Sequence, residues 1–342
     1  MQWDKGFSAR YYAEVIDPKT WRDIKRFEIT SGSIDKQSKE TLIESADITV
    51  KNLEGTGENW IRIWLDARQG RGATAHVALF TGLTAAPERK LNGNRSEFGL
   101  ECYSVLKPAN EVLLERGWYA NITISGADIV KRLLSVTPAP VRVEGTSPKL
   151  SKHIISENGE TRLTMARKIL EAINWTIQIT GMGEIIIKER SDKITATYSK
   201  DMDMIEPNLT DRKDWYSCPN VFRAVSGTSI AIARDDDPDN FLSIPVRGRE
   251  IWKEETDCKL TDGELLAAYA QRRLKEEQSL SRNLKYKRRF DSNVTPDDIV
   301  KIIYPNQKIN GCFRVISQKI TLGHRCKTEE EVTEIEQLNK GA

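Results

Sequence analysis

The sequence predicts a β-rich α+β fold, and three observations support this prediction. Apolar and polar residues alternate with a period of two over much of residues 7–105 and again over residues 284–322. Between these parts, only a few segments have the three- and four-residue spacing that is typical of an amphipathic helix. Turns containing proline, glycine, serine or aspartate separate the segments, and no repeat of roughly 20 to 50 residues indicates a solenoid.

The first part of the chain is predicted to be made of strands. They are residues 7–16, 21–30, 46–50, 60–65, 75–83 and 98–105. The pair Asp17-Pro18 ends the first strand, and Ser31-Gly32-Ser33 is expected to end the second, because these residue types favour turns.

The segment 60–65 is the most informative of these strands. Its odd-numbered positions carry isoleucine, isoleucine and leucine, which belong in a core. Trp60, Arg62 and Trp64 form the other face, which is too bulky for water and too polar for a dry interior. Such residues are enriched at protein–protein interfaces, so we predict that this face meets another subunit. The alternative is that a second sheet or a loop of the same subunit covers it.

The middle of the chain has the pattern of a small α/β unit. We expect a helix, a strand, a second helix and a hairpin at residues 126–135, 141–143, 162–174, and 175–180 with 184–188. Thr161 or Thr164 can cap the second helix. Gly181-Met182-Gly183 is expected to form the hairpin turn.

The last part returns to strands. They are predicted at residues 220–226, 284–290, 298–304 and 312–322, and a helix at 261–278 begins with the capping pair Thr261 and Glu264. From Lys327 onward the chain is acidic and polar, which indicates a final helix or a loose tail.

The composition excludes several classes of protein. Lysine and arginine total 52 against 50 for aspartate and glutamate, so the excess of positive charge typical of a nucleic-acid binder is missing. The five cysteines are scattered and form no CxxC pair, which indicates neither a disulfide framework nor a zinc site. No signal peptide and no apolar run long enough to span a membrane are visible, so we expect no membrane insertion.

Catalytic motifs are not evident either. His76, His153 and His324 lie far apart, and the SxxK motifs at 33–36 and 104–107 fall in predicted strands or turns rather than on a helix. We therefore expect no catalytic residue, no cofactor and no enzymatic activity.

Two charged patterns have simpler interpretations than a ligand site. The run Asp235, Asp237 and Asp239 resembles the start of a calcium loop, but Phe241 and Val246 replace the required glycine and glutamate. We interpret it as a solvated loop without metal. Lysines at 285 and 287 and an arginine at 289 share a strand face without interleaved aromatic residues, which favours an exposed or subunit-contacting face over a nucleic-acid path.

The order of several structural motifs resembles hub-like tail proteins of long-tailed phages, which are similar to the baseplate hub of T-even phages. The motifs are Tyr11-Tyr12-Ala13-Glu14-Val15, Asp17-Pro18-Lys19-Thr20-Trp21, Ser31-Gly32-Ser33-Ile34, Glu44-Ser45-Ala46-Asp47, residues 60–66, Cys102-Tyr103-Ser104, Leu114-Glu115-Arg116-Gly117-Trp118-Tyr119, Asp235-Asp236-Asp237-Pro238, Val246-Arg247-Gly248-Arg249, Pro296-Asp297-Asp298-Ile299-Val300 and Phe313-Arg314-Val315-Ile316-Ser317. No catalytic residue is carried across by them.

The resemblance implies two barrel domains related to the tail-tube subunit, with small α/β domains inserted. Residues 1–124 would form the first barrel and residues 125–205 the insertion. Residues 206–326, with the helix 261–278, would complete the barrels and form the second one, and residues 327–342 would be a tail.

The resemblance also implies a function. Three copies would form a ring that adapts the hexameric tail tube to a trimeric spike or fibre, with DNA passing through its lumen without specific binding. Expected partners are the chain itself, tail-tube or distal tail proteins, spike or fibre proteins and the tape-measure protein. The protein would be assembled in the host cytoplasm and end in the virion. The alternatives are a tail-tip protein that binds carbohydrate or cell wall and, further from the pattern, a peptidoglycan hydrolase.

Overall fold

The computed structural model describes residues 1–51, 57–70, 72–92, 95–150, 152–202, 204–213, 215–256, 258, 265–278, 282–323 and 326–335. The chain forms two compact units. Unit 1 contains Met1–Leu209 and Lys285–Val332, and unit 2 contains Thr210–Leu284 and Thr333–Ala342.

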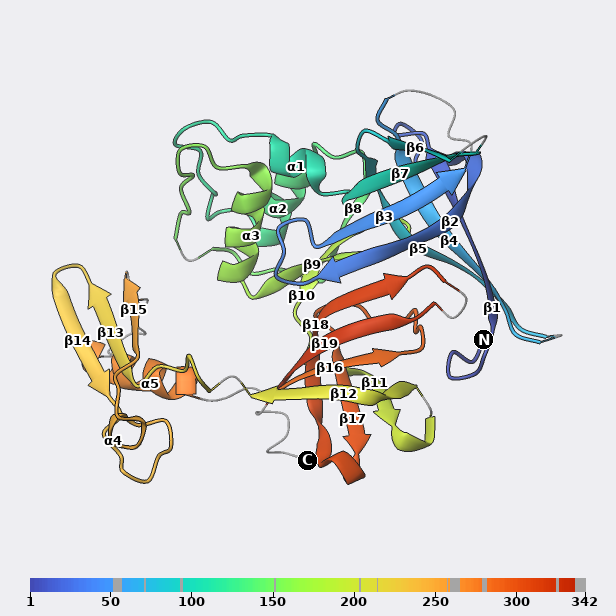
Figure 1. Ribbon diagram of the computed structural model, residues 1–342. Helices are drawn as coiled ribbons and strands as arrows, with labels where there is room; N and C mark the ends of the chain where they lie inside the picture. The colour runs from blue at the N-terminus through green and yellow to red at the C-terminus, as the bar shows by residue number, and fades with distance from the viewer. Residues whose placement is uncertain are drawn as a thin grey trace. The chain divides into compact units, whose positions relative to one another are not determined.

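Strands are the main elements of both units (Figure 1). The strands are β1 (Ser8–Ile16), β2 (Asp23–Gln37), β3 (Glu44–Lys51), β4 (Trp60–Arg68), β5 (Thr74–Thr84), β6 (Glu88–Asn92), β7 (Arg95–Ser104), β8 (Val141–Glu144), β9 (Trp175–Ile179), β10 (Ile185–Glu189), β11 (Ile194–Ser199), β12 (Ile205–Lys213), β13 (Val221–Ser226), β14 (Ser229–Arg234), β15 (Trp252–Thr256), β16 (Arg282–Arg288), β17 (Ile299–Tyr304), β18 (Ile309–Thr321) and β19 (Thr328–Glu334). The helices are α1 (Lys107–Glu111), α2 (Gly126–Leu134), α3 (Arg162–Ala172), α4 (Ile244–Arg247) and α5 (Leu266–Gln278), with 3₁₀ turns at Lys200–Met202 and Pro305–Gln307. The predicted β-rich fold is confirmed.

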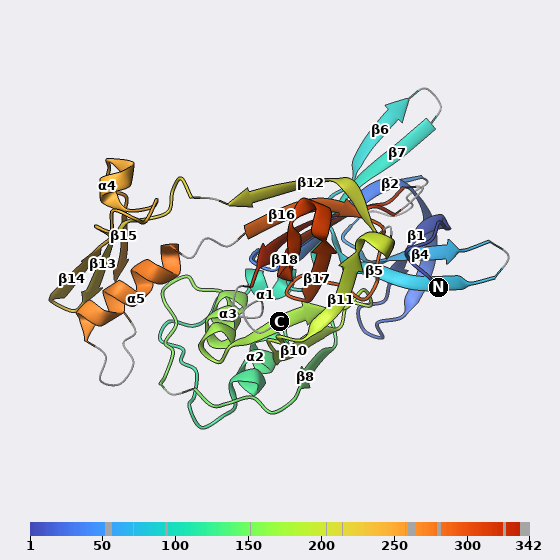
Figure 2. The same cartoon turned by 90° about the horizontal axis from the view of Figure 1, so that it is seen from below.

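Six strands of unit 1 pair in a closed circuit. The antiparallel order is β1-β4-β5-β7-β3-β2, and β2 pairs back onto β1. Ile61, Ile63 and Leu65 of β4 are buried in the core of these barrel strands, as their alternation predicts. A hairpin of β6 and β7 projects beyond them (Figure 2).

Strand β2 joins this circuit to the rest of unit 1. Its predicted end at Ser31-Gly32-Ser33 is wrong, because the strand continues to Gln37 after a bulge near Ile29. A Cβ at Gly32 would lie 2.5 Å from the carbonyl oxygen of Asp47, so the glycine permits close strand pairing rather than a turn. The continued part of β2 pairs with β18.

A second group of strands therefore extends the same sheet. Its order is β18-β19-β16-β12, with β17 pairing to both β18 and β11. Among the described pairings this group is an open path, so a second closed barrel stays a prediction. The helix or loose tail predicted from Lys327 onward is wrong: β19 lies there, with Thr328, Glu330 and Val332 facing inward.

An α/β insert lies between the two strand groups along the chain. It consists of α1, α2 and α3 with the sheet β8-β10-β9, around a core that includes Val130, Leu163 and Ile169. The Thr161 hydroxyl accepts a hydrogen bond from the Thr164 amide at 3.2 Å and caps α3 as predicted. The core begins at Val105, earlier than the predicted boundary at 125, because isolated bridges such as Leu113 to Thr161 tie the preceding loop to the insert.

Unit 2 has its own small core. The sheet β14-β13-β15 is covered on one face by α5, which packs on Phe222, Ala224 and Ala233. The predicted helix 261–278 is therefore part of this separate unit and not of a second barrel. Its predicted capping pair, Thr261 and Glu264, lies outside the described residues.

A buried ion pair in unit 1 makes stability depend on pH. The Nζ atom of Lys36 lies 3.4 Å from Oε2 of the buried Glu44. Burial raises the pKa of Glu44 from its ordinary 4.5 to about 7, although Lys36 opposes this effect. Between these pH values the folded protein holds the proton more tightly than the unfolded chain, so the free energy of unfolding falls as the pH rises.

We expect Glu44→Gln to remove this dependence. In the wild type the loss between pH 4.5 and 7 should reach up to about 3 kcal/mol, since each pKa unit corresponds to about 1.4 kcal/mol. Urea unfolding at several pH values measures it. Asp47→Asn, which changes an exposed carboxylate on the same strand, should keep the wild-type slope. An unchanged slope in Glu44→Gln would contradict the assignment.

Candidate functional site

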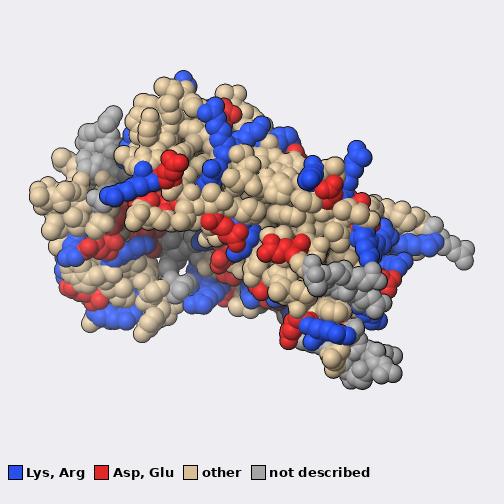
Figure 3. Space-filling view, turned by 90° about the horizontal axis from the view of Figure 1, so that it is seen from above, with Lys and Arg blue, Asp and Glu red and all other residues tan. Residues whose placement is uncertain are grey.

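The surface of the protein mixes both signs of charge. On the face drawn in Figure 3, lysine and arginine side chains are interspersed with aspartate and glutamate. This distribution agrees with the nearly equal totals in the sequence. On this face (Figure 3), the charges of the described residues form no single large patch of one sign.

The predicted face of Trp60, Arg62 and Trp64 is covered within the chain. Arg62 is only 1% exposed, although it is a charged residue on the outside of the barrel strands. Its Nη1 donates to Oδ1 of Asp23 at 2.7 Å and its Nη2 donates to the carbonyl of Met182 at 3.1 Å. Its Nε donates to the Thr81 hydroxyl at 3.3 Å. A buried charge is tolerated when it is paired and hydrogen-bonded in this way.

The covering element is the hairpin turn between β9 and β10. The Thr81 hydroxyl donates to the carbonyl of Gly181 at 2.7 Å, and Nε1 of Trp21 donates to that of Met182 at 3.0 Å. A Cβ at Gly181 would lie 1.8 Å from the carbonyl oxygen of Ala78, and Gly183 has a φ of +77°. The turn therefore needs glycine at both positions, one for close approach and one for its backbone conformation.

Gly181→Ala is expected to separate the insert from the barrel strands. The added methyl group cannot fit against the β5 backbone. The free energy of unfolding should therefore fall by about 3 kcal/mol or more, which is the upper end of the cost of overpacking. Chemical denaturation measures this loss. Gly72→Ala, at a glycine with open space around it, serves as the control. Equal stabilities of the two variants would show that the turn does not dock as described.

The two tryptophans complete this face. Trp64 is 8% exposed and stacks on His76 with ring centroids 4.1 Å apart, while the half-buried Trp60 packs near Trp21 at 5.6 Å. This is the alternative that the sequence left open, in which the same subunit covers the face. A contact of Trp60, Arg62 and Trp64 with another subunit stays a prediction. The sequence predicted the turn at Gly181-Met182-Gly183 but not that this turn covers Arg62.

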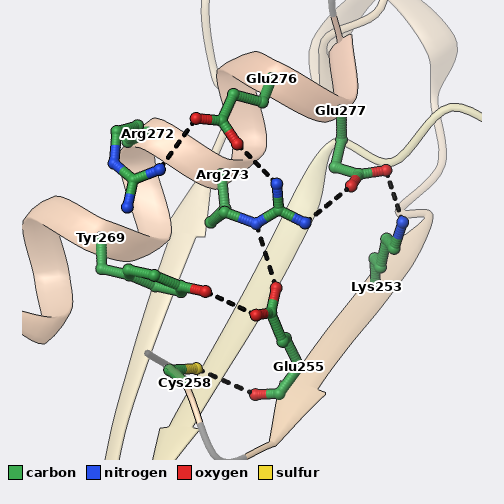
Figure 4. Close-up of polar contacts among 8 residues, drawn as sticks. All are labelled: Lys253, Glu255, Cys258, Tyr269, Arg272, Arg273, Glu276 and Glu277. Atoms are coloured by element: carbon green, nitrogen blue, oxygen red, sulfur yellow. Dashed lines mark hydrogen bonds and ion pairs between the residues drawn. The ribbon is translucent and has the colours of Figure 1, made fainter. Parts of the chain in front are cut away.

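A polar network fixes α5 to the sheet of unit 2 (Figure 4). The carboxylate of Glu255 on β15 accepts from the Tyr269 hydroxyl at 2.5 Å and from Nε of Arg273 at 3.0 Å. These hydrogen bonds lower the pKa of Glu255. Arg273 also pairs with Glu276 and Glu277 of its own helix. The network consists of satisfied pairs, so it indicates a structural role rather than a reaction.

The opposite face of this sheet carries exposed apolar side chains. Ile230 and Ile232 of β14 and Trp252 of β15 are exposed there, on the side away from α5. The sequence analysis did not predict this surface, because β14 and β15 were not recognised as strands. Exposed apolar side chains on a small sheet are typical of a surface that meets another protein.

A pocket of about 610 Å³ lies in the α/β insert. Its lining includes Trp118 and Tyr119 from the loop after α1, Arg132 and Leu133 from α2, and Arg162 at the start of α3. Tryptophan, tyrosine and arginine are the residues most enriched at binding hot spots. This Trp118 pocket is a candidate binding surface; the sequence analysis named residues 114–119 as a structural motif of the resemblance but not as part of a pocket.

The predicted absence of catalytic chemistry stays a prediction. His76 bonds to Asp66 at 2.6 Å and stacks on Trp64, and His153 bonds to the carbonyl of Ala120 at 3.0 Å. His324 lies outside the described residues. Within the described part of the chain, no group of three or more metal-ligating side chains is found, and no helix is long and apolar enough to cross a membrane.

Comparison with known proteins finds relatives by structure. No family model and no curated protein matches the sequence. The tail protein of Neisseria meningitidis MC58 is similar with a TM-score of 0.66 and 15% identity, covering 96% of this chain and 97% of that one. The 43 kDa tail protein of prophage MuSo2 from Shewanella oneidensis has a TM-score of 0.67 and 11% identity, covering 96% and 98%. The fold is that of phage tail proteins.

The tail-protein fold also occurs in a longer protein. A chain of the Francisella PdpA–VgrG complex is similar with a TM-score of 0.59 and 9% identity, and the match covers 98% of this chain and 59% of that one. The resemblance predicted from the motifs is thus confirmed for the fold. Within this fold, the face of Trp60, Arg62 and Trp64 packs against the hairpin turn of the insert.

Proposed function

We propose that the chain is a structural subunit of a phage tail tip or baseplate. Three copies form a ring, as in a hub, that adapts a hexameric tail tube to a trimeric spike or fibre. The observation that carries this proposal is the match to two phage tail proteins over nearly the whole of both chains.

The architecture supports a structural role. The closed circuit of barrel strands continues through β2 into the second strand group, so one sheet runs through unit 1. The α/β insert is fastened to the barrel strands through Arg62 and to the second group through Thr176, whose hydroxyl donates to Asp297 at 2.8 Å. These contacts tie the insert to both strand groups of unit 1, which suits a structural component. We propose a role without catalysis or cofactor.

The proposed partners follow from this role. They are further copies of the chain, tail-tube or distal tail proteins, spike or fibre proteins and the tape-measure protein, and DNA passes through the lumen without specific binding. The mixed surface charge supports the last point, because a DNA-binding lumen would need an excess of basic residues. The protein is assembled in the host cytoplasm and becomes part of the virion.

Light scattering coupled to size-exclusion chromatography tests the ring. The expected molar mass is three times the 38.9 kDa of one chain, and particle images should show threefold rings. The purified rings should also bind to the end of isolated tail tubes. A chain that stays monomeric at all concentrations would count against the proposal.

One observation favours a second function, the binding of carbohydrate at the tail tip. The Trp118 pocket combines two aromatic rings with polar side chains, which suits stacking on a sugar. However, it contains one tryptophan and not the pair expected of a carbohydrate groove. Binding of N-acetylglucosamine oligomers that is lost in Trp118→Ala would support this second function. A peptidoglycan hydrolase would need lytic activity in a zymogram, and we expect none.

A further inference from the structure

The Trp118 pocket has an apolar floor and a hydrophobic rim. Leu114, Ile129 and Leu133 contribute to its lining, and Leu113 and Tyr119 at its edge are 61% and 55% exposed. Large apolar side chains that stand in water around a concave surface are typical of a site that another protein covers.

The pocket also carries charges without partners. Among the described residues, neither the Arg132 guanidinium nor the Glu115 carboxylate has a hydrogen-bond or ion-pair partner, and Nε of Arg162 is buried and unbonded. Because two cations and one anion line it, the pocket is net positive. It therefore suits an occupant that presents an apolar ring together with carboxylates.

Unit 2 presents a loop of that chemistry, residues 235–241, which we call the acidic loop. Asp236 and Asp239 are exposed, and their carboxylates have no partner among the described residues. Phe241 is 57% exposed although it is a large apolar side chain.

The acidic loop is held in one conformation by its own hydrogen bonds. Oδ2 of Asp235 accepts from Asn240 at 2.5 Å and from Gln278 of α5 at 2.7 Å. The Asn240 side chain in turn accepts from the Leu242 amide at 3.1 Å. Asp235 thus acts inside the loop, while Asp236, Asp239 and Phe241 point outward. A loop ordered in advance loses little entropy on binding.

We propose that the acidic loop of one copy docks into the Trp118 pocket of the next copy. Phe241 enters between Trp118 and Leu133, and Asp236 and Asp239 pair with Arg132 and Arg162. The proposal rests on the proposed ring and names the contact that builds it. Because pocket and loop are different surfaces, the contact is head-to-tail, and such contacts form a ring when the rotation from copy to copy closes and a filament when it does not.

Charge reversal tests the contact. Arg132→Glu with Arg162→Glu, and separately Asp236→Arg with Asp239→Arg, should each weaken association at least about tenfold, because like charges then face each other. The chain that carries all four substitutions should regain the association, since the charges are complementary again. Phe241→Ala should weaken association without any change of charge.

Matched controls carry the same changes elsewhere. Lys131→Glu with Lys149→Glu, and Glu171→Arg with Asp201→Arg, alter exposed residues outside the pocket and the loop, and should leave the molar mass unchanged. The readout is molar mass by light scattering over a concentration series, and circular dichroism verifies that each variant is folded.

The outcomes separate this inference from the proposed function. If the wild type is an oligomer and both charge-reversed variants keep its molar mass, the docking is overturned but the ring is not. If the wild type is a monomer, the docking and the ring are both contradicted. If the arginine reversals leave the oligomer intact and abolish binding of N-acetylglucosamine oligomers, the pocket is a carbohydrate-binding site and the docking is overturned.

Discussion

Glu330→Gln is expected to lower the free energy of unfolding by about 3–5 kcal/mol, the cost of leaving one partner of a buried ion pair alone. Nη2 of Arg288 lies 2.5 Å from Oε1 of Glu330, and both side chains are buried. The same carboxylate accepts from the Tyr286 hydroxyl at 2.8 Å and from Gln318 at 2.6 Å. Burial alone would lower the pKa of Arg288, but Glu330 outweighs it and the pKa is raised. An arginine guanidinium does not lose its proton in proteins, so Arg288 stays charged when Glu330 no longer pairs with it.

The neighbouring residue provides the control for this experiment. Glu329 on the same strand pairs with Lys285 and Lys287 at the surface. Glu329→Gln should cost at most about 1 kcal/mol, because exposed ion pairs contribute little. Denaturant unfolding of both variants gives the comparison. If the two variants lose the same stability, the buried pair does not hold β16, β18 and β19 together as we describe.

Arg62→Met is expected to cost about 3 kcal/mol, because the buried Arg62 guanidinium no longer donates hydrogen bonds to Asp23 and to the carbonyl of Met182. Methionine retains much of the packing volume, so the loss reports the polar contacts. The insert should also become easier to detach from the barrel strands, which faster hydrogen exchange in β9 and β10 would show.

A surface pair with the same geometry serves as the reference for Arg62. Nη2 of Arg10 lies 2.7 Å from Oε1 of Glu28, the same distance as between Arg62 and Asp23, but both side chains of that pair are exposed. Arg10→Met should therefore change stability by about 0.5 kcal/mol or less. If Arg62→Met leaves the free energy of unfolding unchanged, the hairpin turn does not cover this face as described.

The sequence by itself determined the type of most elements and the core of β4. Alternation placed Ile61, Ile63 and Leu65 inside. The spacing of apolar residues predicted helices at 126–135 and 162–174, which the structure has as α2 and α3. These predictions succeed because each element buries one face, and the spacing of its apolar residues along the sequence shows which face is buried. The order of the motifs also pointed to the fold of phage tail proteins, which the solved structures then matched.

Only the tertiary structure decided what covers each face. The sequence of β19 looks like a polar tail because it contains several glutamates. One of them, Glu330, is nevertheless buried, since it pairs with Arg288, which lies 42 residues earlier in the chain. Likewise, Arg62 looks like an interface residue until the turn at Gly181–Gly183, more than a hundred residues later, supplies its acceptor. The same holds for the Trp118 pocket, whose walls come from a loop and two helices. Local sequence patterns show that a strand or helix is amphipathic. Which residues cover its face depends on contacts between parts of the chain that are distant in sequence.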